Sequence, residues 1–195
     1  PEDDVESVLA DAVTATADQG GVVVIPAFAV DRTEVVLWHL DRLVRAGRIP
    51  RLPVFVDSPM ALRALGVYRR AAADGSPEVR PELHGQALFG ALDLREASTV
   101  EESKAINVRR GPFVIVSASG MATGGRVLHH LAERLGSSRN TVLLVGFQAP
   151  GTRGDRLARG APTVKLLGGY RRVRAHIVHV DLSAHADQDD LVAWL

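Results

Sequence analysis

Apolar residues recur along this chain with two different periods, and segments of the two kinds alternate. Val5, Leu9 and Val13 lie four positions apart, which predicts an amphipathic helix at the N-terminus that ends at Gly20. Residues 22–25, VVVI, then form an unbroken β-branched run of the kind found in strands buried on both faces. The chain therefore begins with a helix followed by a strand.

The same alternation continues to the end of the chain. The pattern predicts further helices, which begin at 31 or 33 and run to 45, begin at 59, and span 123–135, 152–159 and 187–195. It predicts further strands over 52–56, 113–116, 141–145, 163–167 and 172–180. Residues 71–98 are the least regular, and we expect only some helix there, between 79 and 90. Alternating helices and strands predict an α/β fold with a mostly parallel sheet flanked by helices.

Composition narrows the class of protein. The chain has 195 residues, of which 46% are hydrophobic, enough for one domain with a real core. No apolar run reaches the roughly 18–20 residues of a membrane helix, so we expect a soluble, cytoplasmic protein. The absence of cysteine excludes disulfides, a thiol nucleophile and an iron–sulfur cluster. Lys+Arg and Asp+Glu both number 23, which excludes a chain that is basic overall.

The ends of the sequence indicate a piece of a longer protein. The sequence has no initiator methionine and both begins and stops inside predicted helices. We therefore expect an excised or inserted piece of a longer protein, and a small complete protein is the alternative.

Candidate chemistry lies in the loops that follow the predicted strands, because ligands of open parallel sheets bind beside the carboxyl ends of the strands. The loop at 117–126, SASGMATGGR, combines serines and glycines before a helix, which suits a phosphate; an ordinary tight turn is the alternative. It is not a P-loop, and no G-x-G-x-x-G follows the first strand. The candidate phosphate-binding residues of this loop are Ser117, Ser119, Gly120, Gly124, Gly125 and Arg126.

His185 is the candidate proton donor, because Ser183 precedes it and Asp187 follows it in the last of these loops. The alternative is a helix cap formed by the serine and the aspartate, with a bystander histidine. The other histidines receive no role: His39 and His84 are expected at the surface or partly packed, and the remaining four lie as helix or strand neighbours that point apart. No H-x-H-x-D-H or H-E-x-x-H array occurs, so the sequence indicates no metal centre in this chain.

Five segments taken together resemble a known family. In chain order they are IPAFAVDR (25–32), VDSPMA (56–61), SASGMATGGR (117–126), GFQAPGTRG (146–154) and SAHADQ (183–188). This series resembles the β-CASP domain of metallo-β-lactamase-fold nucleases, in particular RNA-processing enzymes related to the cleavage and polyadenylation specificity factor endonuclease. The resemblance runs from Gly20 to Leu195. It implies that residues 1–195 form a single Rossmann-like β-CASP domain, inserted as a cassette into a metallo-β-lactamase domain that holds two zinc ions.

The resemblance also implies roles for residues. His185 corresponds to the family's motif B and would protonate the leaving oxygen of the phosphodiester or stabilise its charge, whereas motif A falls at or before the N-terminus, where Glu2 or Asp3 stands in. Ser183, Arg32, Arg126 and Arg153 would face RNA in the cleft between the two domains. Motif C and every zinc ligand would lie outside this chain, so we expect the chain alone to be inactive.

The sequence therefore predicts the RNA-clamping, catalysis-assisting part of a zinc-dependent ribonuclease. Its expected partners are single-stranded RNA and the metallo-β-lactamase domain of the same parent chain, with a second copy of the chain as a further candidate and no membrane. A non-catalytic RNA- or partner-binding module of a degenerate family member is one alternative. An unrelated nucleotide-binding α/β enzyme is another.

Overall fold

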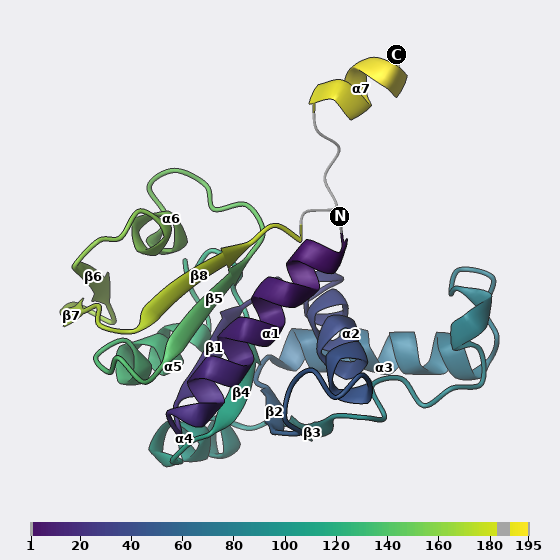
Figure 1. Ribbon diagram of the computed structural model, residues 1–195, viewed down its shortest axis with the longest axis horizontal. Coiled ribbons are helices and arrows are strands. Elements are labelled where there is room, and N and C mark those ends of the chain that lie inside the picture. Colours follow the sequence, from purple (N-terminus) through teal and green to yellow (C-terminus); the bar gives the residue numbers. More distant parts are fainter. Residues whose placement is uncertain (1, 183–187, 195) are drawn as a thin grey trace.

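The continuous apolar runs form a six-stranded sheet in the computed structural model of the protein, which describes residues 2–182 and 188–194 (Figure 1). Every pair of neighbouring strands in this sheet is parallel. In spatial order the strands are β3 (Asp93–Glu96), β2 (Pro53–Val56), β4 (Phe113–Ser117), β1 (Val22–Pro26), β5 (Thr141–Val145) and β8 (His176–Val180). The predicted α/β fold with a mostly parallel sheet is confirmed.

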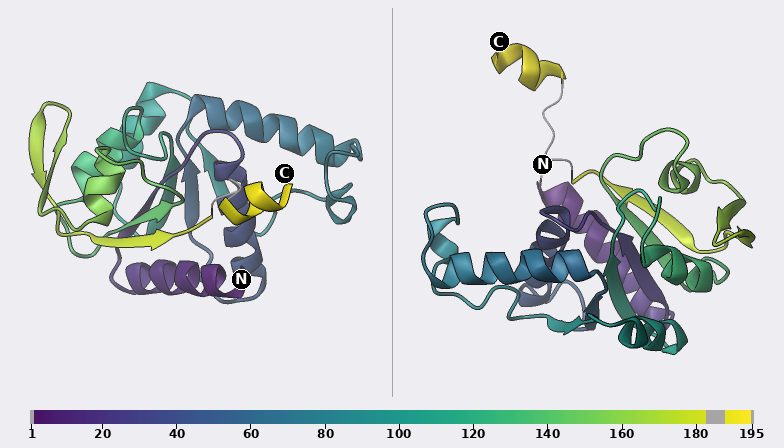
Figure 2. Two further views of the ribbon diagram at one scale, coloured as in Figure 1. Left: turned by 90° about the horizontal axis from the view of Figure 1, so that it is seen from above. Right: turned by 180° about the vertical axis from the view of Figure 1, so that it is seen from behind.

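Helices cover both faces of the sheet, because alternate residues of the central strands point to opposite sides and are apolar on both (Figure 2). Val23 and Ile25 pack on one side, against α1 (Glu2–Asp18), α2 (Arg32–Arg45) and α3 (Pro59–Ala73). Val22 and Val24 pack on the other, against α4 (Val100–Val108), α5 (Val127–Arg134) and α6 (Arg153–Ala158). The last described helix is α7 (Gln188–Trp194). None of the described helices has the length and apolar content needed to cross a membrane.

The connections between strands bring five loops to one edge of the sheet. From β1 the chain moves to β2 and β3 on one side, returns through β4, and crosses β1 to reach β5 and β8 on the other side. Since all the strands are parallel, the loops after β1, β2, β4, β5 and β8 all leave from the same edge. The candidate loops named from the sequence are therefore neighbours in space.

The strand predicted over 163–167 is β6 (Thr163–Leu166), which forms a separate antiparallel hairpin with β7 (Gly169–Arg172), a strand that was not predicted. The prediction of a strand over 172–180 is wrong at its start, because β8 begins only at His176. The backbone N–H of Val173 donates to the carbonyl of Pro162, and that of Ala175 donates to the carbonyl of Leu135. The first of these hydrogen bonds continues the hairpin pairing by one position, and the second joins the chain to the end of α5 before β8 begins.

Three further local predictions are corrected. The helix predicted over 123–135 begins only at Val127, because residues 118–126 form a folded loop. The helix expected between 79 and 90 is a single 3-10 turn, Pro81–Leu83. The strand β3 and the helix α4 were not predicted, although Thr99 and Glu102 form a capping box at the start of α4.

Candidate functional site

Backbone pairing continues past the ends of the strands and holds the loops together. The N–H of Ala27, after β1, donates to the carbonyl of Ser117 at the end of β4 (3.0 Å). The N–H of Gly146, after β5, donates to the carbonyl of Val180 at the end of β8 (2.9 Å). The side-chain amide of Gln148 is buried and donates to the carbonyl of Gly120 (3.3 Å). The loops after β1, β4 and β5 and the end of β8 are therefore joined into one surface.

A buried carboxylate lies under this surface. Asp57, the first residue after β2, is 0% exposed. Its carboxylate accepts hydrogen bonds from Arg126 (2.7 Å), from Nε2 of His130 (2.6 Å) and from the hydroxyl of Ser103 (2.5 Å). The hydroxyl of Ser117 donates to the backbone carbonyl of Asp57 (2.7 Å). Asp57 therefore ties together β2, β4, α4, α5 and the loop before α5 through its side chain and its backbone carbonyl.

The charge of this carboxylate is fixed by its donors. Burial acts to raise the pKa of Asp57, but the hydrogen bonds from His130, Ser103 and Arg126 outweigh it, so the pKa lies below its ordinary value. Nδ1 of His130 lies 2.7 Å from the side-chain oxygen of Asn107, so both ring nitrogens of this histidine have partners. Asp57 is an ionised anchor whose oxygens are occupied, which suits a structural role rather than proton transfer.

Neither Asp57 nor His130 was assigned a role from the sequence, and His39 was expected at the surface or partly packed. His39 is in fact buried, with Nδ1 3.3 Å from the carboxylate of Glu6. The available signals were an aspartate directly after a predicted strand and a histidine on a later predicted helix, which together could have indicated the Asp57–His130 pair. The two residues are separated by 73 positions, so no local motif contains both.

The loop at 118–126 is folded around the hydroxyl of Ser119. This oxygen accepts hydrogen bonds from the backbone N–H groups of Thr123 (3.1 Å) and Gly124 (3.2 Å). Gly125 has φ +79°, and a Cβ atom there would lie 2.4 Å from the carbonyl oxygen of Ala118. The backbone N–H groups of Gly125 and of the next residue take part in no hydrogen bond within the described part of the chain. The loop therefore presents two free backbone donors at the start of α5.

The three predicted arginines are all engaged with, or packed into, the fold. Besides Asp57, Arg126 contacts the backbone carbonyls of residues 97 and 98 (both 3.1 Å). Arg153 donates to the carbonyl of Thr123 (3.0 Å) and to that of Lys165 (2.7 Å). Arg32 is 9% exposed at the first turn of α2. The guanidinium groups of Arg126 and Arg153 hold loops in position, and contact of all three arginines with RNA stays a prediction.

The other predicted site residues fall in different places. Ser117 is buried, and the backbone at Gly120 packs so closely on the ring of Phe28 that a Cβ would lie 3.0 Å from it. Glu2 is the first residue of α1. Ser183 and His185 lie outside the described residues, so their predicted roles stay predictions.

Two exposed aromatic rings at this edge were not identified from the sequence. Phe28, after β1, is 45% exposed, and Phe147, after β5, is 64% exposed. Large apolar rings are normally covered in a folded protein, so exposed rings beside polar loops are candidates for base stacking. Aromatic residues inside strand–loop–helix turns were the available signal.

The described residues also define what the site lacks and what borders it. No group of three or more His, Asp or Glu side chains among residues 2–182 and 188–194 could hold a metal ion, so the described part of the chain does not fit a zinc centre.

A cavity of about 470 Å³ lies beside the loops after β4 and β5. Its lining residues are Thr123, Pro150, Gly151, Thr152, Arg153, Arg156, Val164 and Lys165.

Comparisons with known proteins agree with this architecture. Ribonuclease TTHA0252 of Thermus thermophilus is 40% identical over 182 residues, which are 92% of this chain and 42% of the relative. The RNase J-like protein of Methanocaldococcus jannaschii is 30% identical over 191 residues, 97% of this chain and 43% of the relative. The transcription termination factor FttA of Methanosarcina mazei is 30% identical over 200 residues, 98% of this chain and 31% of the relative. The chain thus spans less than half the length of these relatives.

Two family profiles match the chain. The profile of the Zn-dependent metallo-hydrolase RNA specificity domain matches residues 170–195, which include β8. The profile of the Beta-Casp domain matches residues 33–157, and this range contains Asp57, Ser119 and Arg126. Since that match covers well over half of the chain, the chain belongs to the Beta-Casp domain family, as its five loop sequences predicted.

Proposed function

We propose that this chain is the β-CASP part of a zinc-dependent ribonuclease, where it holds single-stranded RNA and assists hydrolysis of the phosphodiester bond. The observation that carries this proposal is the joined loop surface above Asp57, at the edge where parallel sheets bind ligands. The printed names of two relatives, a ribonuclease and an RNase J-like protein, support the reaction class. The name of the second matching profile supports RNA as the ligand.

The anchored carboxylate gives the surface its rigidity. Arg126 is held by Asp57 at one end of the loop, and Ser119 folds the middle of the same loop around its hydroxyl. A backbone held in this way presents its free N–H groups in a fixed direction, which favours an anion at the start of a helix. We place a phosphate of the RNA at the N–H groups of Gly125 and Arg126. The exposed rings of Phe28 and Phe147 would stack on bases beside it.

His185 is the proposed proton donor in this arrangement. A general acid must reach the leaving oxygen of the scissile bond, and the loop after β8 leaves from the same sheet edge as the phosphate-binding loop. Glu2, in the first turn of α1, is the proposed stand-in for the family's acidic motif. We assign both zinc ions to the metallo-β-lactamase domain of the parent chain. No step proposed for the residues of this chain therefore requires a metal ion bound to them.

Residues 1–195 would act as one folded unit inserted into that domain. The pairing of β8 with β5 supports this, because it makes a strand from the second profile match part of the same sheet as the strands of the first. The family assignment removes the alternative of an unrelated nucleotide-binding enzyme. An RNA-binding module without cleavage stays the second candidate, because some relatives carry the name of a transcription termination factor and not of a ribonuclease.

The test uses the complete protein encoded by the gene that contains this chain, and the chain alone in parallel. Each is incubated with end-labelled single-stranded RNA, with zinc and with a zinc chelator. We expect the complete protein to cleave RNA only with zinc, and the chain alone to bind RNA without cleaving it. Binding without cleavage by a complete protein that retains an H-x-H-x-D-H motif would support the non-catalytic alternative. Cleavage by the chain alone would contradict the assignment of the zinc ions.

A further inference from the structure

The β6–β7 hairpin carries a face that the fold does not use. Its antiparallel register pairs Lys165 with Tyr170 and Thr163 with Arg172. Directly opposed residues of a hairpin point to the same side, so these four side chains share one face. The intervening β6 residues, Val164 and Leu166, are buried in the core. The shared face is therefore the outer one, and all four of its residues are exposed.

The charge around this face has one sign. No Asp or Glu occurs between residues 156 and 180, whereas this stretch contains Arg156, Arg159, Lys165, Arg171, Arg172 and Arg174. Arg159 pairs with Asp155, and Arg156 lies close enough to that carboxylate to lower its pKa. The other four cations have no carboxylate partner among the described residues. In a chain with zero formal net charge, this is a local concentration of positive charge that the fold leaves unneutralised.

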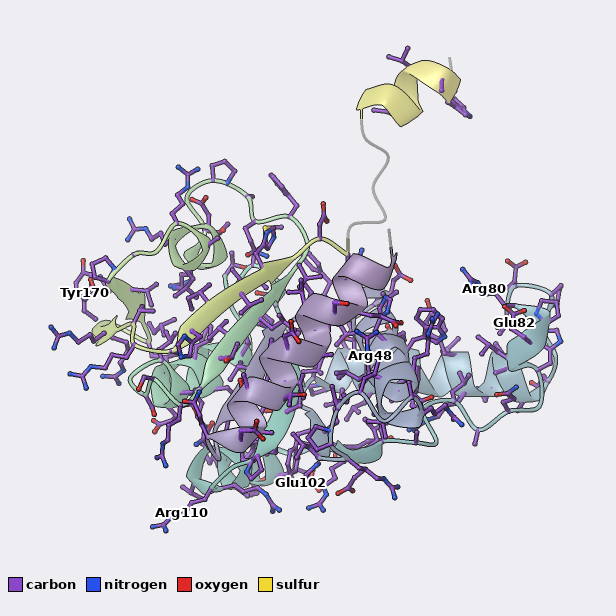
Figure 3. The ribbon with its side chains drawn as sticks, viewed as in Figure 1. Arg48, Arg80, Glu82, Glu102, Arg110 and Tyr170 are labelled. Carbon is purple, nitrogen blue, oxygen red and sulfur yellow. The ribbon has the colours of Figure 1, made fainter. Side chains whose placement is uncertain are left out.

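An aromatic ring lies within this positive charge. Tyr170 is 69% exposed and projects from the end of the hairpin (Figure 3). It adds nothing to the core, because the buried residues of the hairpin are on β6. A ring flanked by cations is the arrangement that binds unpaired bases, which stack on the ring while the cations contact the phosphates. A duplex offers no free base face, so the arrangement favours a single strand.

A cavity connects this face to the candidate site. Lys165 lines the cavity of about 470 Å³ together with Arg153 and Arg156, and Thr123 of the loop after β4 lines it as well. Three basic side chains therefore line the cavity that lies between the hairpin and the loop of the proposed phosphate site.

We propose that the outer face of the β6–β7 hairpin is a second binding site for single-stranded RNA, which extends the RNA path beyond the proposed catalytic cleft. A base stacks on Tyr170, and Lys165 and Arg172 contact phosphates. The proposal rests on the proposed function, because it concerns the same substrate. A protein partner is the competing occupant, but none of the four residues of the face is aliphatic, and Leu167, in the turn, is the one exposed aliphatic side chain of the hairpin.

The experiment measures binding of fluorescein-labelled oligouridylate to the 195-residue chain by fluorescence anisotropy at several salt concentrations. Tyr170→Ala is expected to weaken binding about tenfold through lost stacking, whereas Tyr170→Phe keeps the ring and binds within about twofold of wild type. The double variant Lys165→Gln/Arg172→Gln is expected to weaken binding and to lower the slope of log K against log salt by about 1.4, at roughly 0.7 per phosphate contact.

The matched control is Arg80→Gln/Arg110→Gln, which removes the same charge from exposed positions away from the hairpin (Figure 3). It should bind RNA within about twofold of wild type, since only general attraction changes. Unchanged RNA binding by the hairpin variants would overturn the inference and leave the proposed function intact. A loss of RNA binding in the control variant equal to the loss in the hairpin variants would do the same. A wild-type chain that binds no oligouridylate would also overturn it, and the cleavage assay on the complete protein would then decide the proposed function separately.

Discussion

The carboxylate of Asp57 and Nε2 of His130 lie 2.6 Å apart, and both side chains are 0% exposed. The first residue follows β2 and the second belongs to α5, so the pair joins two elements across β4. A buried charge of this kind is tolerated only when its hydrogen-bonding positions are occupied, and here Ser103 and Arg126 occupy the rest. The rigidity of the loop surface depends on this pair.

His130→Ala should therefore destabilise the chain strongly. The variant removes one donor from a buried carboxylate and leaves a cavity, for which we expect a loss of about 3 kcal/mol in the free energy of unfolding. Urea unfolding followed by circular dichroism measures it. The matched control is His129→Ala, at the exposed neighbouring position of the same helix, which should change the free energy by no more than about 0.5 kcal/mol. Equal effects of the two variants would show that the pair does not stabilise the fold.

The pH dependence of stability should reveal the same carboxylate. Because the folded pKa of Asp57 lies below its ordinary value of 3.8, the ionised form stabilises the fold above that value, and this contribution is lost as pH falls through the folded pKa. Asp57→Asn removes the charge and should cost about 1–3 kcal/mol at neutral pH. The difference between variant and wild type should shrink as pH falls from about 5 to about 3. A difference independent of pH, measured by urea unfolding, would contradict an ionised Asp57.

Glu34 should behave in the opposite way. Its side chain is buried in the first turn of α2, neither carboxylate oxygen has a hydrogen-bond partner, and burial raises its pKa above the ordinary value of 4.5. The protonated form is thus favoured by folding, so its stabilisation is present below the ordinary pKa and is lost as pH rises through the folded pKa.

Glu34→Gln should then stabilise the chain at neutral pH by an amount on the order of 1 kcal/mol, with no gain near pH 4. The amide also removes the repulsion between Glu34 and Asp31. Thermal melts at the two pH values measure the effect, with the exposed Glu78→Gln as the control that should show neither change. Destabilisation at neutral pH would indicate that the carboxylate has a favourable interaction that the substitution breaks.

Two adjacent glycines provide an internal comparison within the phosphate loop. Gly125 has φ +79° and a Cβ there would lie 2.4 Å from the carbonyl oxygen of Ala118, whereas a Cβ at Gly124 would meet nothing within 4 Å. Gly125→Ala should lower the free energy of unfolding by about 2 kcal/mol through strain and the close backbone contact, and Gly124→Ala by less than about 0.5 kcal/mol. Urea unfolding of both variants tests this, and a reversed order would show that the loop can rearrange around a side chain.

The sequence predicted the order of most elements because their signals are local. The runs at 22–25, 113–116 and 141–145 are apolar on both sides, and only a central strand of a two-faced sheet buries such a run. The strand β3 escaped prediction because DLRE has one apolar residue, and only pairing with β2 makes it a strand. The break between β7 and β8 depends on a carbonyl at Leu135, which no local pattern contains.

The candidate site divides in the same way. The loop residues Ser119, Gly124 and Gly125 were found because serine and glycine between a strand and a helix have a local meaning. Asp57 and His130 were missed because their roles arise only when folding brings together residues 73 positions apart. Local patterns therefore indicated the candidate loops, whereas the buried pair that supports them became visible only in three dimensions.

His185→Ala in the complete protein tests the catalytic proposal. A general acid that protonates the leaving oxygen accounts for roughly 10²–10⁴-fold in rate, and we expect turnover of single-stranded RNA to fall by that factor. Zinc content, measured by metal analysis, should not change, because the zinc ligands are assigned to the other domain. The matched control is His176→Ala, an exposed histidine of β8 whose side chain makes no hydrogen bond among the described residues. Unchanged turnover in the His185 variant, or an equal loss in the control, would remove the histidine from the reaction and leave this chain a role in RNA binding alone.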